Sequence, residues 1–307
     1  MKSVSKLNGF LNLYKPLDWT SHDCVAKTRG LLQTKKVGHG GTLDPKATGV
    51  LPLAIGNCTR LLQYLPTEKA YRAVIRLGVC TTTDDLEGEV ISSPGAIDLT
   101  LDTIKSVLPR FIGSITQVPP VYSAIQVNGK RLYDLARSGV PIEQIAVPPR
   151  QVEVKAIEVL DWQAGEFPEL TVDITCGGGT YIRSISRDLG VAVGSVATLV
   201  NLVRTQSCNL VLVDAVDFAA IEAGKFSLQS PLVALAHLPR LELSVDQIAD
   251  WYKGKPILWL DLAVNDQPLV VSGLSNDNTT HSLLGIGFSK MSSNGSLLCP
   301  KVVLENL

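Results

Sequence analysis

Several features are missing from this sequence of 307 residues, and each absence excludes a class of protein. No segment reaches the roughly 20 consecutive apolar residues that span a bilayer. Residues 1–16 hold too short an apolar stretch for a signal peptide. Charged residues make up 19% of the chain and hydrophobic residues 45%, a balance typical of a folded globular protein and not of a disordered one. We therefore expect a cytoplasmic globular protein that divides into two domains, because the chain is longer than one typical domain.

The sequence also lacks the short patterns that hold metals, disulfides or nucleotides. Its six cysteines lie at least 22 residues apart and form no C-x-x-C pair. Its four histidines show no spacing typical of a metal site. The glycine-rich stretches 38–41 and 177–179 match neither G-K-[ST] nor G-x-G-x-x-G. We expect free thiols, no metal and no cofactor.

The charge of the chain is unevenly distributed, although the net charge is only −1. Residues 1–83 hold 12 Lys or Arg against 4 Asp or Glu, and residues 105–150 hold 6 against 2. A basic surface of this kind neutralises the phosphates of a nucleic acid. An ordinary solvated basic face is the alternative interpretation.

Alternating apolar residues predict strands with one buried face. The pattern starts at Tyr71 and runs to residue 77, and it recurs over 170–176. Residues 50–55 form a short apolar run typical of a buried strand. Helices are predicted between these strands without a regular βαβ alternation, which favours an α+β fold with a mixed, mostly antiparallel sheet flanked by helices.

Helix boundaries are indicated by capping residues and by glycines. Thr20 and Asp23 form a capping-box pattern at the start of a helix that ends near residue 33. Thr180 is the expected N-cap of a helix over 181–189. Apolar periodicity and turn residues predict two more helices, over 101–111 and 130–138.

The residue pattern of the sequence changes near residue 238. Short β-rich segments separated by Asn, Asp, Gly and Ser turns follow, over residues 257–262, 269–272, 283–288 and 297–304. We predict a first domain over residues 1–237 and a small, mostly β second domain over residues 238–307.

Asp44 is the carboxylate on which a chemical hypothesis depends. It lies in "GHGGTLDPKATGVLPLAIG", a loop of glycines and small residues that enters the core. A carboxylate there can act as a nucleophile that later leaves again. From the residues alone, the alternative is that Asp44 caps a turn before Pro45.

Six segments resemble, in order, the motifs of the TruB-type pseudouridine synthases, the bacterial tRNA pseudouridine-55 synthases. They are "LYKPLDWTS", "VGHGGTLDPKATGVLP", "YRAVIRLG", "TDDLEG", "QVPPVYSAIQVNGKRLYDLARSG" and "GGGTYIRSISRDLG". The region after residue 238 resembles, less specifically, a PUA-type RNA-binding domain. Two residues depart from the family pattern: Asp18 stands at a usual glycine, where a left-handed turn can survive, and Val203 stands at a usual arginine, leaving Arg204 alone.

The resemblance implies a function and a partner. The protein would isomerise the uridine at position 55, in the T-loop of tRNA, to pseudouridine without a cofactor. It would bind the T-arm through the shape of the folded RNA, with the C-terminal domain toward the acceptor end, and it would act as a monomer.

The resemblance also implies roles for individual residues. Asp44 would be the nucleophile, toward the sugar C1′ or the uracil C6, and Arg183 would pair with it. Tyr71 would stack on the flipped base and can serve as a base, although a tyrosine on a strand's apolar face is by default a core residue. His39 would fill the space left by the extruded nucleotide. The expected substrate contacts are completed by Asp85 (or its neighbour Asp84), Lys15, Tyr181 and Leu202, although Lys15 also suits an ordering role in its motif.

Two other functions compete with this hypothesis. One is a non-catalytic protein that binds or folds tRNA and uses the aspartate loop only as scaffold. The other is a transglycosylase that exchanges a base in tRNA through an aspartate. That family typically needs zinc, so the metal content of the purified protein separates the two enzymes.

Overall fold

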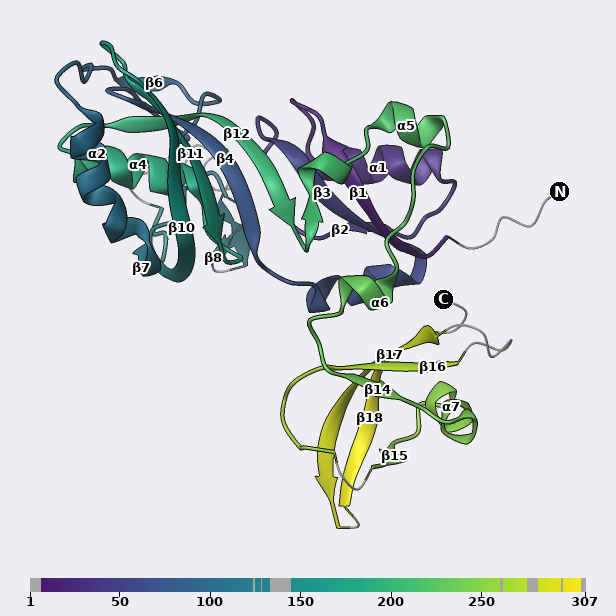
Figure 1. The fold of residues 1–307 in the computed structure, drawn as a ribbon. Helices are drawn as coiled ribbons and strands as arrows, with labels where there is room; N and C mark the ends of the chain where they lie inside the picture. The colour runs from purple at the N-terminus through teal and green to yellow at the C-terminus, as the bar shows by residue number, and fades with distance from the viewer. Residues whose placement is uncertain are drawn as a thin grey trace.

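The computed structural model describes residues 7–123, 125–127, 129–132, 145–259, 262–274, 281–293 and 295–304. Two sheets dominate these residues (Figure 1). No helix among them has both the length and the apolar character needed to cross a membrane.

The larger sheet has nine strands in the order β1-β3-β12-β4-β11-β10-β7, with β2 beside β3 and β13 beside β12. All neighbouring pairs are antiparallel except β3 with β12. The predicted mixed, mostly antiparallel sheet is therefore confirmed. The strands are β1 (Gly9–Lys15), β2 (Val37–His39), β3 (Thr48–Ile55), β4 (Lys69–Leu77), β7 (Gly113–Gln117), β10 (Arg150–Gln163), β11 (Glu169–Cys176), β12 (Ala197–Ser207) and β13 (Leu210–Val211).

Helices and two small hairpins surround this sheet. The hairpins pair β5 (Cys80–Thr81) with β6 (Val90–Ser92) and β8 (Gln126–Val127) with β9 (Lys130–Arg131). The helices are α1 (Ser21–Leu31), α2 (Leu101–Val107), α4 (Ile182–Ala192), α5 (Phe218–Glu222) and α6 (Pro231–Ala234), with 3-10 turns η1 (Gly56–Tyr64), η2 (Leu108–Phe111) and η4 (Leu212–Asp214).

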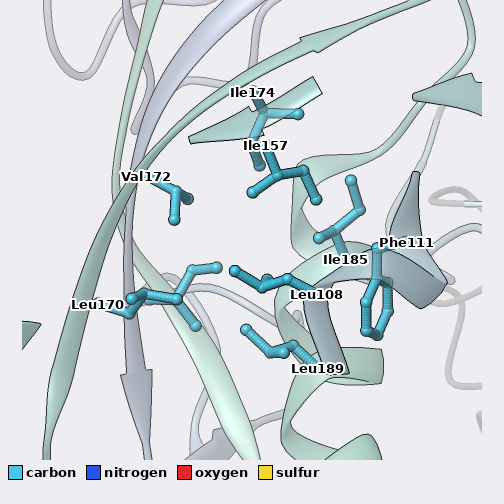
Figure 2. A pocket seen from close by; sticks show the side chains of 9 residues that line it. Leu108, Phe111, Ile157, Leu170, Val172, Ile174, Ile185 and Leu189 are labelled. Carbon is cyan, nitrogen blue, oxygen red and sulfur yellow. The ribbon is translucent and has the colours of Figure 1, made fainter. Parts of the chain in front are cut away.

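The main core lies between the sheet and the helices α2 and α4. Tyr71, Ala73, Ile75 and Leu77 are all buried in it, as the alternation in β4 predicts. Figure 2 shows an apolar gap in this core where the strands face η2 and α4. Every residue that lines the gap is aliphatic or phenylalanine, so it offers no polar group to a substrate.

The helix starts test the capping predictions. Thr20 caps α1 in the predicted capping box with Asp23. The N-cap of α4 is Tyr181, so the prediction of Thr180 is wrong by one residue. The Thr180 hydroxyl donates instead to the carbonyl of Gly177 at 3.1 Å. The free N–H group of Tyr181 is satisfied by the side-chain oxygen of Gln117 at 2.8 Å, a partner outside the local sequence.

The structure differs from the prediction at the other two helices. The α-helix over 101–111 ends at Val107 and continues as the 3-10 turn η2, which contains Pro109. The helix predicted over 130–138 does not begin at Lys130, because Lys130–Arg131 forms β9 after a turn in which Gly129 has φ +79°. Residues 133–138 lie outside the described residues.

The second sheet has the order β14-β16-β17-β18-β15 and confirms the mostly β character of the C-terminal region. Its helix α7 (Val245–Tyr252) was not predicted, and Trp251 of that helix is fully buried, with its Nε1 donating to the carbonyl of Leu284 at 2.9 Å. The strands are β14 (Arg240–Glu242), β15 (Ile257–Leu258), β16 (Leu269–Leu274), β17 (His281–Ser292) and β18 (Gly295–Val303).

The two sheets share an apolar interface. The 3-10 turn η1 and the helix α6 lie between them (Figure 1). One buried cluster joins Phe10 of β1, Leu61 of η1 and Leu235 after α6 to Val270 and Ile286 of the second sheet. Burial of this apolar surface attaches the second sheet to the first.

Candidate active site

Asp44 occupies the loop between β2 and β3. The residues on both sides of it, Leu43 and Ala47, are 4% and 2% exposed and pack in the main core with Tyr71. The Asp44 side chain keeps 36% of its surface exposed. The loop is therefore anchored at both flanks and presents its carboxylate toward solvent.

A buried lysine ties this loop to β1. Lys15 is 0% exposed, and its Nζ donates to the carbonyls of Pro16, Trp19 and Pro45 at 2.9, 2.6 and 3.0 Å. An ammonium group has three donors, so none is left over for a substrate. Burial lowers the pKa of Lys15 to about 8. This placement supports the ordering role of Lys15 over the substrate contact that the motif suggested.

A buried arginine holds the other side of the same loop. Arg204 of β12 is 0% exposed and donates to the carbonyls of Gly41, Thr42 and Val50 at 3.2, 3.2 and 2.7 Å. Sequence reasoning did not assign this role. The available signal was a charged residue on the buried side of an apolar strand, where a partner is required.

Ser21 adds a third attachment that sequence reasoning missed. Its hydroxyl accepts from the N–H of Leu43 at 2.9 Å and donates to the carbonyl of the same residue at 3.1 Å. Lys15 and Ser21 belong to the first motif, so one function of that motif is to hold the loop of Asp44.

The structure shows the surroundings of Asp18 and Val203, the two residues that depart from the family pattern. Asp18 has φ +64° and keeps the left-handed turn, as expected. Its N–H donates to the carbonyl of Pro45 at 3.0 Å and its carboxylate lies 2.6 Å from Lys46 Nζ. Val203 is half-buried and pairs in register with Thr48 and Arg72.

Arg183 connects Asp44 to the segment that follows β5. It is the second residue of α4, and its side chain is only 6% exposed. Its Nη2 lies 2.9 Å from Asp44 Oδ2, and its Nε lies 3.5 Å from Asp85 Oδ2. The guanidinium also donates to the carbonyls of Thr83 and Tyr122 at 3.2 and 3.1 Å.

The structure distinguishes Asp85 from Asp84. Asp85 is 5% exposed, faces Arg183, and accepts from the Thr83 hydroxyl and from the N–H of Glu87. Asp84 points instead to Arg187, one turn further along α4, with 3.0 Å between Oδ2 and Nη1. Burial raises the pKa of Asp84, and the Arg187 charge opposes that rise. Asp85 is therefore the carboxylate that belongs to the Asp44 site.

Tyr71 and Leu202 border the site from the sheet. They are 6% and 7% exposed and lie in the same buried cluster as the flanks of Asp44. Tyr71 pairs in register with Arg204 on one side and with Ile174 on the other. Burial raises the pKa of Tyr71 to about 12. The phenol is therefore protonated at neutral pH.

His39 and Tyr181 make no hydrogen bond or ion pair with Asp44 in the part of the chain that the structure describes. His39 ends β2 opposite Leu53, and burial together with the Arg204 charge lowers its pKa. Burial raises the pKa of Tyr181, and the Asp44 charge adds to the rise. The Gln117 amide fixes Tyr181 by bonding both its N–H and its carbonyl, at 2.8 and 3.1 Å.

A surface groove lies at the other end of β4. Residues 94–99 and 193–195 line it together with Glu166, beside Gly78, which follows the strand. Tyr71 and Gly78 are seven positions apart along the chain, which corresponds to about 23 Å of strand. The groove is therefore separate from the Asp44 site. Among the described residues, no group of three or more His, Cys, Asp or Glu is arranged to hold a metal ion.

Comparison with solved structures identifies the fold. The chain aligns with a chain of the crystal structure of a Cbf5-Nop10-Gar1 complex with a TM-score of 0.70, covering 99% of this chain and 86% of that one at 24% identity. A second solved structure, an archaeal box H/ACA sRNP Nop10-Cbf5 complex, aligns with a TM-score of 0.69, covering 99% and 88% at 23% identity.

Comparison with known sequences identifies the family. Residues 29–182 match the sequence model of the TruB family pseudouridylate synthase (N terminal domain). The chain is 50% identical over 297 residues to tRNA pseudouridine synthase B of Microcystis aeruginosa, covering 97% of this chain and 99% of the relative. It is 49% identical over 302 residues to the protein of the same name from Synechocystis sp., with the same two coverages.

The class of protein defined by these results is a pseudouridine synthase. The chain belongs to the TruB family of pseudouridylate synthases. It is an isomerase, so neither the non-catalytic protein nor the base-exchanging transglycosylase is supported.

Proposed function

We propose that this chain converts a uridine of tRNA to pseudouridine, and that the uridine is the one at position 55 in the T-loop. The names of the related proteins support tRNA as the substrate. The observation that carries the chemistry is the ion pair between the buried Arg183 and the partly exposed Asp44, 2.9 Å apart.

The reaction needs a group that attacks and then leaves. The C1′–N1 bond of uridine breaks, the uracil rotates while bound, and a new bond joins C1′ to C5. The proton on C5 is lost to water and N1 acquires one, so atoms balance without a co-reactant. Asp44 is the nucleophile, toward either C1′ or C6. Arg183 fixes the direction of this carboxylate through a charge-assisted contact.

The other residues act on the base and on its surroundings. The uridine leaves the folded RNA to reach Asp44, and the ring of Tyr71 stacks on it. His39 fills the space that the nucleotide leaves. Asp85, Tyr181 and Leu202 contact the base or the sugar, and Lys15 positions the loop.

The wider RNA contacts use both parts of the chain. The basic surfaces within residues 1–83 and 105–150 face the T-arm and recognise its shape. Residues 238–307 form a PUA-like RNA-binding domain that lies toward the acceptor end. The protein acts as a monomer in the cytoplasm.

Tritium release from an unmodified tRNA transcript labelled at C5 of uridine tests the proposal. Wild type should release the label, and Asp44→Ala should bind the same tRNA without release. Asp102→Ala is the matched control, because it removes an exposed carboxylate from α2. A second transcript with cytidine at position 55 should give no release from wild type. Failure of the folded, tRNA-binding wild type to release tritium would overturn the enzymatic proposal, and release from the second transcript would overturn the assignment of position 55.

A further inference from the structure

Lys69 is a cation in the active-site region, and it has no role in the proposed mechanism. It is the first residue of β4 and lies two residues before Tyr71, on the same side of the strand. A Cβ atom built on Gly41 would lie 3.2 Å from Lys69 Nζ and 3.9 Å from Arg204 Nη1. The Lys69 ammonium therefore stands beside the loop of Asp44, next to a second cation.

Among the residues that the structure describes, no carboxylate pairs with this ammonium. Within the described ranges, Lys69 Nζ makes no hydrogen bond and no ion pair. Its chain neighbour Glu68 is already paired with Lys155. Arg204 donates to three carbonyls and pairs with no carboxylate of the described part of the chain. Burial lowers the pKa of Lys69, and the Arg204 charge lowers it further.

Other lysines of the chain show the usual arrangement. Lys27, Lys46, Lys155 and Lys255 each contact a carboxylate. The fully buried Lys15 bonds three carbonyls. A half-buried ammonium without such a partner, held beside a guanidinium, destabilises the free protein. Its position is explained if an anion arrives with the substrate.

We propose that Lys69 Nζ binds a backbone phosphate of the RNA, at the target nucleotide or its immediate neighbour. The inference rests on the proposed function, because it takes RNA as the substrate. A phosphodiester is the anion present at every step of an RNA chain, and an ammonium binds it as a compact charge. Gly41 has no side chain, which leaves room for the RNA backbone to approach Nζ. The phosphate then pairs with the Lys69 ammonium beside the loop of Asp44.

The first test is the salt dependence of tRNA binding by Lys69→Met and Lys69→Gln. Loss of one phosphate contact should weaken binding about 5-fold near 0.1 M salt and make the slope of log K against log salt shallower by about 0.9. Lys225→Met, at an exposed lysine that follows α5 and lies outside both basic stretches, is the control. The thermal midpoint of each Lys69 variant should equal or exceed that of wild type, because an uncompensated charge is removed. Unchanged affinity and slope in the folded variants would overturn the inference.

The second test locates the phosphate. T-arm RNAs carry a neutral methylphosphonate at one position at a time around the target uridine. At one position, wild type should lose about 5-fold in affinity while Lys69→Met loses nothing further. A structural role would instead lower the thermal midpoint of both variants and give equal losses for wild type and variant at every position, which overturns the inference. Tritium release by wild type is measured in parallel. Absence of release would overturn the proposed function. Release together with equal affinity losses for wild type and Lys69→Met at every methylphosphonate position would overturn only the phosphate contact.

Discussion

Arg183 Nη2 lies 2.9 Å from Asp44 Oδ2, and this contact joins a helix start to a loop that is far away in the sequence. Arg183 is the second residue of α4, where the positive end of the helix dipole disfavours a cation. Asp44 and Asp85 offset that cost, because both carboxylates face the same guanidinium. The arrangement fixes the direction of the Asp44 carboxylate, and two backbone carbonyls that accept from Nη1 and Nη2 hold the guanidinium in place.

Substitution of Arg183 should lower turnover more than tRNA binding. Arg183→Lys keeps the charge but cannot reach two carboxylates and two carbonyls at once, so we expect kcat to fall about 100-fold with KM within about 3-fold. Arg183→Met should also destabilise the protein by about 2 kcal/mol, since it leaves the buried Asp85 without its cation. Tritium release and urea unfolding measure the two effects. Arg187→Lys, one turn along α4, is the control and should keep wild-type kcat. Equal losses in the two lysine variants would contradict a special role for Arg183.

The elements that were predicted correctly are those specified by neighbours in the chain. Tyr71 opens an alternating strand whose apolar face is buried, and Thr20 with Asp23 forms a capping box, so local patterns were sufficient. The start of α4 was missed by one residue. The N–H of its N-cap residue, Tyr181, donates to Gln117, 64 residues away, and no local pattern reveals a partner at that distance.

The residues that hold the candidate site were harder to predict than those that face it. Three separate motifs pointed to Asp44, Arg183 and Asp85, and the structure brings these three residues together. Lys15 and Arg204 act by donating to backbone carbonyls of distant segments. A carbonyl carries no sequence signature, so the partner of a buried cation can be required on physical grounds without being identified.

The pH dependence of stability should report the buried Lys15. Its pKa is about 8 in the folded protein and 10.5 at its ordinary value. Between these values the unfolded chain binds more protons than the folded one, so the free energy of unfolding rises with pH across that window. The difference between wild type and Lys15→Met should therefore grow in favour of wild type by about 2 kcal/mol between pH 7 and 10.

Urea unfolding at several pH values measures this difference. Lys46→Met serves as the control, because Lys46 is exposed and its ion pair with Asp18 raises its pKa. The difference between wild type and that variant should not grow in favour of wild type over the same range. A wild-type advantage over Lys15→Met that shrinks with pH would contradict the lowered pKa of Lys15.

Tyr71 should act through its ring and its protonated phenol in the free enzyme. With a pKa of about 12, only about one molecule in 10⁵ carries the phenolate at pH 7. We expect kcat/KM of wild type to stay within about 3-fold between pH 7 and 9. Tyr71→Phe should bind tRNA with wild-type affinity and show the same flat profile at lower kcat. A tenfold rise in kcat/KM per pH unit, present in wild type and lost in Tyr71→Phe, would assign the phenolate as a base.

Gly49 should be the most sensitive glycine at the join between the two halves of the large sheet. It has φ +101°, and a Cβ atom there would lie 2.3 Å from the carbonyl oxygen of Arg204 on β12. Both the backbone conformation and the clash oppose alanine, so we expect Gly49→Ala to lose about 4 kcal/mol or more of stability. Gly113→Ala is the matched control: φ is +94°, but nothing lies within 4 Å of the added atom, so strain alone should cost about 1–2 kcal/mol.

Urea unfolding compares the stability of the two variants. Arg204 also holds the carbonyls of Gly41 and Thr42, so folded Gly49→Ala should lose turnover while Gly113→Ala keeps it. Equal destabilisation by the two alanines would show that the approach of β12 to β3 is not tight at this point.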